Sequence, residues 1–110
     1  MMKKLKVLFV CTYNMMRSKT AEMIYKEDER FEVKSAGIDE AAEVKVNFDS
    51  LTWADYIVVM EPRHRQWIEE HYPDLSASKE IHCLDVPDMY DFMEPALMDL
   101  LRERIENVFK

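Results

Sequence analysis

Apolar and polar positions follow two spacings along the chain, and these spacings predict strands separated by helices. Runs rich in valine, isoleucine and phenylalanine are typical of buried strands, whereas apolar residues three and four positions apart indicate helices. On this pattern we expect strands at residues 5–11, 31–35, 56–60 and 79–84. The expected helices run from about Ser18 to Glu27, from Pro62 to Tyr72, and onward from Pro95.

Strands that alternate with helices favour one parallel sheet with helices on both faces, a doubly wound α/β fold. With right-handed crossovers and the strand order 2-1-3-4, the first strand of this four-stranded sheet lies at the topological switch point. Ligands bind outside the carboxyl ends of the strands at such a point. Residues 39–55 fit neither spacing well and predict a short strand or a short helix.

Length and charge limit the class of protein. A chain of 110 residues supports one core, so we expect residues 1–110 to form a single domain. The 15 basic and 22 acidic residues give a formal net charge of −7, which argues against nucleic acid or an anionic membrane as partner. Two cysteines cannot build a disulfide framework, and neither a signal peptide nor a membrane-spanning run is apparent, so we expect a cytoplasmic protein.

Basic residues 63–65 open the second expected helix, where cations oppose the helix dipole. They indicate either a local anion or partner site or a solvated face, and the solvated face is favoured. His64, His71 and His82 do not fall at metal-ligand spacing with cysteine or carboxylate residues. We therefore expect an exposed position for each histidine, and we predict neither a metal nor another cofactor.

The first expected strand ends at Cys11, five residues separate this cysteine from Arg17, and Ser18 opens the next helix. Backbone N–H groups of such a loop can point at phosphate oxygens, the helix dipole favours negative charge, and a guanidinium adds a bidentate contact. The same field favours the thiolate form of Cys11. The segment therefore predicts an anion site that contains a nucleophilic sulfur.

This segment resembles the phosphate loop of the low-molecular-weight protein tyrosine phosphatases, whose signature is a cysteine, five residues and then Arg-Ser. A cysteine and an arginine at this spacing arise often by chance, so the signature alone is weak. Further resemblances follow in the family's order, at residues 35–37, at residues 54–60, and at Asp88 and Tyr90. The chain is therefore identified as a short, divergent member of this family.

The resemblance implies a metal-independent phosphomonoester hydrolase that forms a cysteinyl-phosphate intermediate. Cys11 is the implied nucleophile, and Arg17 holds two phosphate oxygens. The implied phosphate-binding residues form one loop: Thr12, Tyr13, Asn14, Met15, Met16, Arg17 and Ser18. Within it, Asn14 holds a left-handed backbone conformation, and the Ser18 hydroxyl, which also stands where it can cap the helix, stabilises the sulfur anion.

A carboxyl group must protonate the leaving oxygen and later accept a proton from water, and the acidic loop before the last helix offers three. Asp88 fits the family pattern best, followed by Asp85 and then Asp91. Tyr13 and Tyr90 either flank the substrate or pack as partly exposed aromatic residues.

Three positions depart from the family or stand out in the chain. Tyr13 replaces a glycine and is strained if that position needs a positive φ. Met16 stands where the family often has a second cysteine, so oxidised Cys11 lacks an adjacent thiol. Gly37, the single glycine of the sequence, indicates a positive φ, a close approach to the loop, or an ordinary turn.

The implied substrate is a phosphotyrosine protein or a small phosphoester, with inorganic phosphate or another oxyanion as a ligand of the same loop. An alternative is a catalytically weak phosphate-binding or protein-interaction module, because residues 39–55 are abbreviated relative to the family. An arsenate reductase ranks third. Its thiol relay needs two further cysteines, and Cys83 is the single other cysteine of the sequence.

Overall fold

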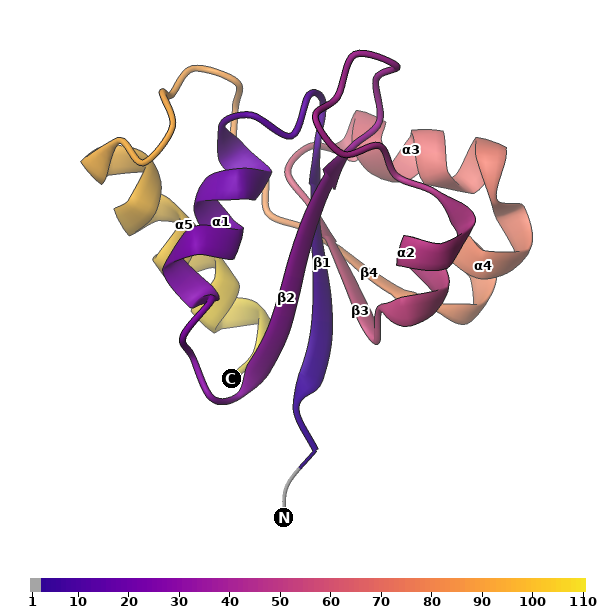
Figure 1. Cartoon of the computed structure of the whole chain (residues 1–110), viewed down its shortest axis with the longest axis horizontal. Coiled ribbons are helices and arrows are strands. Elements are labelled where there is room, and N and C mark those ends of the chain that lie inside the picture. The colour runs from indigo at the N-terminus through magenta and orange to yellow at the C-terminus, as the bar shows by residue number, and fades with distance from the viewer. Residues whose placement is uncertain (1–2) are drawn as a thin grey trace.

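Four parallel strands form the central layer of the computed structural model, which describes residues 3–110 (Figure 1). The strands are β1 (Leu5–Cys11), β2 (Phe31–Gly37), β3 (Tyr56–Val59) and β4 (Glu80–Cys83). The helices are α1 (Arg17–Tyr25), α2 (Phe48–Trp53), α3 (Pro62–His71), α4 (Pro73–Ser78) and α5 (Pro95–Val108). Strands and helices alternate almost throughout, as the two spacings predict.

The sheet order is β2-β1-β3-β4, and every neighbouring pair is parallel, so the predicted fold class and strand order are confirmed. β1 occupies the centre, with Cys11 opposite Gly37 of β2 and Val10 opposite Val59 of β3. Its carboxyl end therefore lies where the chain turns from one side of the sheet to the other.

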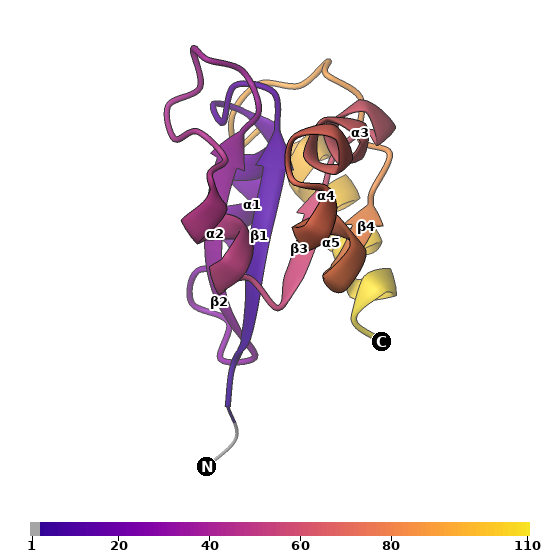
Figure 2. The ribbon, with the colours of Figure 1, turned by 90° about the vertical axis from the view of Figure 1, so that its right-hand side faces the viewer.

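The two faces of the sheet are covered by different helices (Figures 1 and 2). Val7 and Phe9 of β1 point into a core shared with α1 and α5, whereas Leu8 and Val10 point into a core shared with α2 and α3. Both sets are buried, which explains why β1 is apolar at consecutive positions and does not alternate.

The structure corrects two local predictions and decides between the two alternatives left open for residues 39–55. Helix α1 begins at Arg17, so Ser18 lies inside its first turn and does not cap it. The poorly patterned residues 39–55 contain a helix, α2, which begins with a capping box between Asn47 and Ser50. Pro73 ends α3 as predicted, but it also opens α4, because proline fits the first turn of a helix.

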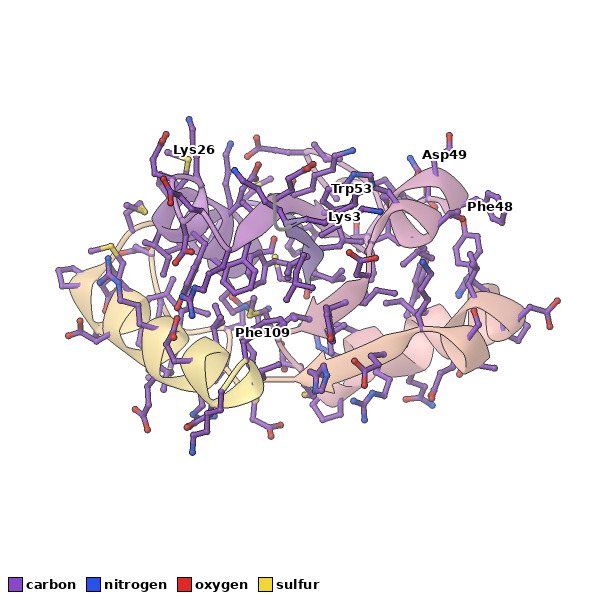
Figure 3. The ribbon with its side chains drawn as sticks, turned by 90° about the horizontal axis from the view of Figure 1, so that it is seen from below. Lys3, Lys26, Phe48, Asp49, Trp53 and Phe109 are labelled. Atoms are coloured by element: carbon purple, nitrogen blue, oxygen red, sulfur yellow. The ribbon has the colours of Figure 1, made fainter. Side chains whose placement is uncertain are left out.

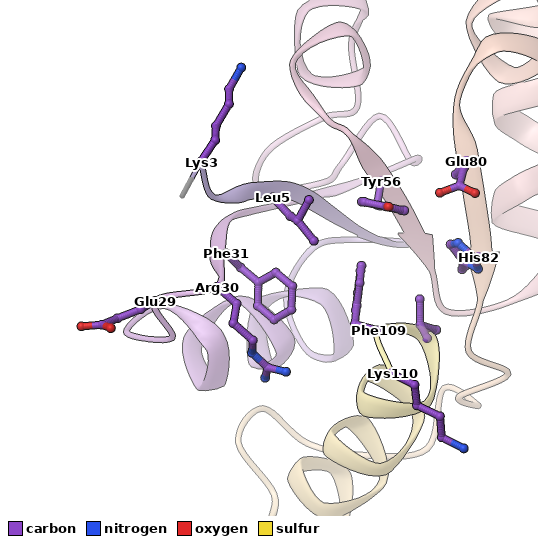
Figure 4. A pocket seen from close by; sticks show the side chains of 11 residues that line it. Lys3, Leu5, Glu29, Arg30, Phe31, Tyr56, Glu80, His82, Phe109 and Lys110 are labelled. Carbon is purple, nitrogen blue, oxygen red and sulfur yellow. The ribbon is translucent and has the colours of Figure 1, made fainter. Parts of the chain in front are cut away.

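The two ends of the sheet carry different hollows. At the amino ends of the strands, a hollow of about 740 Å³ lies between Leu5, Tyr56 and the last turn of α5 (Figures 3 and 4). At the carboxyl ends, the loops after β1 and β2 and the loop before α5 come together (Figure 1). Across residues 3–110, no helix is both long and apolar enough to pass through a membrane.

Candidate active site

The loop between β1 and α1 holds Cys11 beside a polar pair. Cys11 is buried, and its Sγ lies 2.9 Å from Ser18 Oγ. Asn14 Nδ2 donates a hydrogen bond of 2.9 Å to the same Ser18 oxygen. Because this hydroxyl accepts from Asn14, its own hydrogen can be donated to the sulfur or to the more distant Ala36 carbonyl oxygen, at 3.4 Å, and donation to the sulfur suits a thiolate.

Asn14 has a φ of 56°, so it occupies the left-handed conformation expected of this residue. Tyr13 does not have a positive φ, and the expected strain at this position is therefore absent. The loop turns at Asn14, whose short polar side chain tolerates the conformation, and a bulky side chain fits the position before it.

Within residues 3–110, the backbone carbonyl groups of the loop are hydrogen-bonded, whereas its backbone amides are free. The carbonyl oxygens of residues 11, 12 and 13 accept hydrogen bonds of 3.0–3.1 Å from the amides of residues 38, 39 and 43. Among the residues that the structure describes, by contrast, none accepts a hydrogen bond from the backbone amides of residues 12–17. These free amides precede and open the first turn of α1, which is the arrangement that binds anions at a helix N-terminus.

Gly37 sits where the loop crosses the end of β2. A Cβ atom at this position would lie 2.5 Å from the Thr12 carbonyl oxygen and 2.9 Å from the Asn14 amide nitrogen, both backbone atoms. Its φ is not positive, so the interpretation as a close approach to the loop is confirmed and the positive-φ interpretation is wrong. Glycine is needed here for space.

Arg17 is the largest fully buried side chain, with 2% of its surface exposed. Its Nη1 donates to Glu61 Oε2 at 2.5 Å and to the Val86 carbonyl oxygen at 2.8 Å. Burial acts to raise the pKa of Glu61, but hydrogen bonds from Arg17 and Arg63 outweigh it and hold this pKa below its usual value. Arg17 is therefore held in place by an ionised carboxylate on the far side of the loop.

Cys11 and Arg17 open into one pocket of about 210 Å³ at the carboxyl end of β1. The pocket is lined by Cys11, Thr12, Tyr13, Met15, Met16, Arg17 and Asp88. Asn14 and Ser18 are buried behind it, where they hold the loop. A tetrahedral oxyanion in this pocket would meet the sulfur, the guanidinium and the free amides together.

Asp88 is the acidic candidate that lines this pocket; its Oδ1 lies 3.9 Å from Arg17 Nη2, and its side chain is 55% exposed. Asp85 instead lies beside Cys83, with Cys83 Sγ 3.6 Å from its Oδ1. The amide of Asp91 donates to Glu94, within the same connection. Tyr90 packs against the core shared with α1 and α5 and is not part of the pocket lining.

The chain resembles known proteins both in sequence and in structure. The family model described as low molecular weight phosphotyrosine protein phosphatase matches residues 6–48, which contain β1, the loop, α1 and β2. The curated proteins include no match to the chain. The predicted resemblance to the low-molecular-weight protein tyrosine phosphatases is thereby confirmed for this part of the chain.

Solved structures share the fold at low sequence identity. The YwlE arginine phosphatase from Geobacillus stearothermophilus is 21% identical, with a TM-score of 0.70, over 96% of this chain and 92% of that chain. Wzb from Vibrio vulnificus in complex with benzylphosphonate is 20% identical, with a TM-score of 0.75, over 96% of this chain and 97% of that chain. The tyrosine phosphatase Wzb from Escherichia coli K30 in complex with phosphate is 18% identical, with a TM-score of 0.76, over 96% of both chains.

Behind the phosphatase-like loop, α3 supplies polar residues from the basic segment 63–65, for which a solvated face was favoured over an anion or partner site. His64 is fully buried, so its expected exposed position is wrong, and its Nε2 lies 3.0 Å from Thr12 Oγ1. Arg63 Nη2 also donates to Thr12 Oγ1, at 2.8 Å, although half of the Arg63 side chain is exposed. Two signals were available: the basic run at residues 63–65, and its position close after a buried strand at that strand's carboxyl end.

Proposed function

We propose that this chain is a metal-independent phosphomonoester hydrolase that works through a cysteinyl-phosphate. Cys11 Sγ attacks phosphorus, the bond from phosphorus to the ester oxygen breaks, and Asp88 gives that oxygen a proton. Water then attacks the phosphorus, loses a proton to the Asp88 carboxylate, and displaces the Cys11 thiolate with release of phosphate. The single observation that carries the proposal is that Cys11, Arg17 and the free loop amides converge on one pocket.

The positive charge that this chemistry requires comes from the chain itself. Glu61 and the Val86 carbonyl hold Nη1 of Arg17, which fixes the plane of its guanidinium, while Nη2 remains on the side of Asp88 and the pocket. A group held in this way does not need to reorganise as charge moves onto the phosphoryl oxygens, and such preorganised donors are usually the largest source of rate enhancement.

We propose a phosphotyrosine side chain, in a protein or a small phosphoester, as the substrate. The structural neighbours include both an arginine phosphatase and a tyrosine phosphatase, so the fold leaves both chemistries open. The pocket walls favour tyrosine, because Tyr13, Met15 and Met16 present apolar surface that suits an aromatic ring. A phosphoarginine guanidinium would meet a single carboxylate there, that of Asp88.

Hydrolysis of para-nitrophenyl phosphate in the presence of a metal chelator tests the proposal. We expect the wild type to be active, Cys11→Ser to be inactive, and Asp88→Asn to lose about 10²- to 10⁴-fold in kcat, the usual contribution of a positioned acid or base. Asp91→Asn is the matched control, since Asp91 lies outside the pocket lining and should keep full activity. Activity that survives Cys11→Ser would exclude the proposed nucleophile.

A second candidate is a phosphate-binding module without efficient turnover. It is favoured by the exposure of Asp88, whose contact with Arg17 spans 3.9 Å and leaves the carboxyl group free to move. The same assay distinguishes the two functions. A wild type that binds phosphate or vanadate with the expected Cys11 and Arg17 dependence, but never hydrolyses the ester, would establish the module.

A further inference from the structure

His64 lies in the first turn of α3, beneath the loop that follows β1. Both ring nitrogens are engaged: the backbone N–H of Glu61 donates to Nδ1 at 3.0 Å, and Nε2 lies 3.0 Å from Thr12 Oγ1. Because Nδ1 accepts a hydrogen bond, the proton of the neutral ring is on Nε2, which donates it to Thr12.

The surroundings of His64 keep the ring neutral. Burial first, and then the charges of Arg17 and Arg63, lower its pKa to about 4, against a smaller opposite effect of Glu61. A protonated imidazole here would face two guanidinium groups in a buried setting. The neutral ring supplies a hydrogen-bond donor at this position without adding a third positive charge.

The Thr12 hydroxyl receives more than one donor. Arg63 Nη2 donates to its oxygen at 2.8 Å and His64 Nε2 at 3.0 Å, while Arg17 Nη2 lies 3.5 Å away. A hydroxyl oxygen has two lone pairs and one hydrogen. Because these donors occupy the lone pairs, the Thr12 hydrogen is directed away from them, and Thr12 lines the pocket that contains Cys11.

We propose that His64 is a positioning residue of this site, which acts through Thr12. The His64 Nε2–H fixes the Thr12 hydroxyl as a hydrogen-bond donor toward an anion in the pocket, either the Cys11 thiolate or a phosphate oxygen. The consequence for catalysis rests on the proposed phosphatase function, whereas the consequence for anion binding and for the reactivity of Cys11 does not.

Two pairs of variants separate this role from simple packing. Thr12→Val removes the hydroxyl and keeps the branched shape, and Thr12→Ser keeps the hydroxyl. His64→Leu removes both ring nitrogens, and His64→Gln keeps a donor near the position of Nε2. His71→Leu is the matched control, because His71 is an exposed histidine on the same helix that contacts the Trp67 carbonyl and not the loop.

Three quantities are measured on each purified, folded variant: the dissociation constant of inorganic phosphate, the pH profile of Cys11 alkylation by iodoacetamide, and kcat and KM on para-nitrophenyl phosphate. We expect Thr12→Val and His64→Leu each to weaken phosphate binding by about 10-fold or more, the usual effect of losing a hydrogen bond to a charged group. Both should move the alkylation profile to higher pH. Thr12→Ser, His64→Gln and His71→Leu should stay close to the wild type.

The double variant decides whether His64 acts through Thr12. If it does, Thr12→Val combined with His64→Leu should lose little more phosphate affinity than either single variant. Each single variant already removes the hydrogen bond that the Thr12 hydroxyl donates to the anion. Fully additive losses would overturn the proposal, as would a His64→Leu variant that lowers the melting temperature while phosphate affinity and alkylation stay unchanged. If His64→Leu does not fold, Thr12→Val with unchanged phosphate affinity and alkylation overturns the proposal by itself.

The same measurements separate this inference from the proposed function. A wild type that hydrolyses no phosphoester would remove the phosphatase proposal, yet phosphate affinity and alkylation would still report on Thr12 and His64. Conversely, a fully active Thr12→Val variant with wild-type phosphate affinity and alkylation would remove the inference and leave the phosphatase proposal intact.

Discussion

The two ends of the parallel sheet hold hollows of opposite character. The hollow at the amino ends is the larger, about 740 Å³ against about 210 Å³, and the rings of Phe31, Tyr56 and Phe109 form an aromatic cluster in its lining (Figure 4). Its charged side chains are of both signs: Lys3, Arg30 and Lys110 with Glu29 and Glu80. The pocket at the carboxyl ends is small, but one buried guanidinium and a run of free amides converge on it.

The difference follows from the direction of the strands. In a parallel sheet a helix that follows a strand begins at the carboxyl edge, so the N-termini of α1, α3 and α5 gather there, and the free amides of residues 12–17 lie at the start of α1. The amino edge receives helix ends instead, and α5 ends there beside Phe109. The volume of a hollow therefore does not indicate where the anion site lies in this molecule, whereas the direction of the strands does.

The strongest test of this contrast removes the buried guanidinium. Arg17→Met should abolish measurable phosphate binding and lower the free energy of unfolding by up to about 3 kcal/mol, because the partly buried Glu61 carboxylate loses its shortest ion pair and keeps the half-exposed Arg63 as its partner. Adding Glu61→Gln should recover part of that stability and none of the binding. Urea unfolding and phosphate titration check both statements, and a double variant that binds phosphate normally would contradict the role given to Arg17.

The next test fills the space at Gly37. Gly37→Ala should lower the free energy of unfolding by about 1–3 kcal/mol and weaken phosphate binding, because the new methyl group meets the Thr12 oxygen and the Asn14 nitrogen. Ala42→Gly removes the third neighbour of this position, at 2.8 Å, but leaves both backbone contacts. The double variant should therefore remain destabilised, and full recovery would place the clash at Ala42 instead.

A third test uses pH. Burial and then the charges of Arg17 and Arg63 lower the pKa of His64 to about 4 in the folded chain, whereas the unfolded histidine titrates near its ordinary value of about 6.5. Between these values the unfolded chain binds the extra proton, so stability falls as pH falls. The loss should be about 2 kcal/mol between pH 7 and pH 5, measured by urea unfolding. His64→Gln should show a correspondingly flatter profile, and an equally steep profile would assign the loss to other groups.

The smallest effect is expected at the amino end. Arg30 pairs with Asp28 at 2.8 Å and with Glu106 at 2.7 Å, but all three are at least partly exposed. Arg30→Met should change the free energy of unfolding by less than about 1 kcal/mol and leave hydrolysis of para-nitrophenyl phosphate unchanged. A marked loss of activity from this variant would show that the two ends of the sheet are coupled.

The repeating features of this fold could be predicted from the sequence. The four strands follow from apolar runs or from alternation, the helices α1 and α5 follow from apolar positions three and four residues apart, and α3 follows from the prolines at its two ends. The short helix α4 was not predicted, and α2 was left open between a short strand and a short helix, because six residues contain too few turns for a period to show. There, a local cap and a first-turn proline decide the structure.

Most of the site was predictable because one segment carries it, and Asp88 was favoured through its resemblance to the family pattern. Cys11, Asn14 and Arg17 lie on a single loop, so a motif brings them together, and the structure places Cys11 and Arg17 in one pocket. Glu61 and His64 reach the same loop from a distant helix, and a contact between residues 12 and 64 has no sequence period. Asp88 lines the pocket and Tyr90 does not, a distinction that depends on how the loop before α5 folds onto α1.

Gly37 also constrains the register in which β2 pairs with β1. A slip of β2 by one residue against β1 would place Ala36 or Ile38 opposite Cys11, and either side chain would bring a Cβ to the place where the Thr12 carbonyl passes. The loop after β1 therefore clashes with a β2 strand that is paired in a shifted register. Because glycine has no Cβ, the loop fits over β2 when Gly37 lies opposite Cys11. The anion site therefore depends on correct pairing of the sheet.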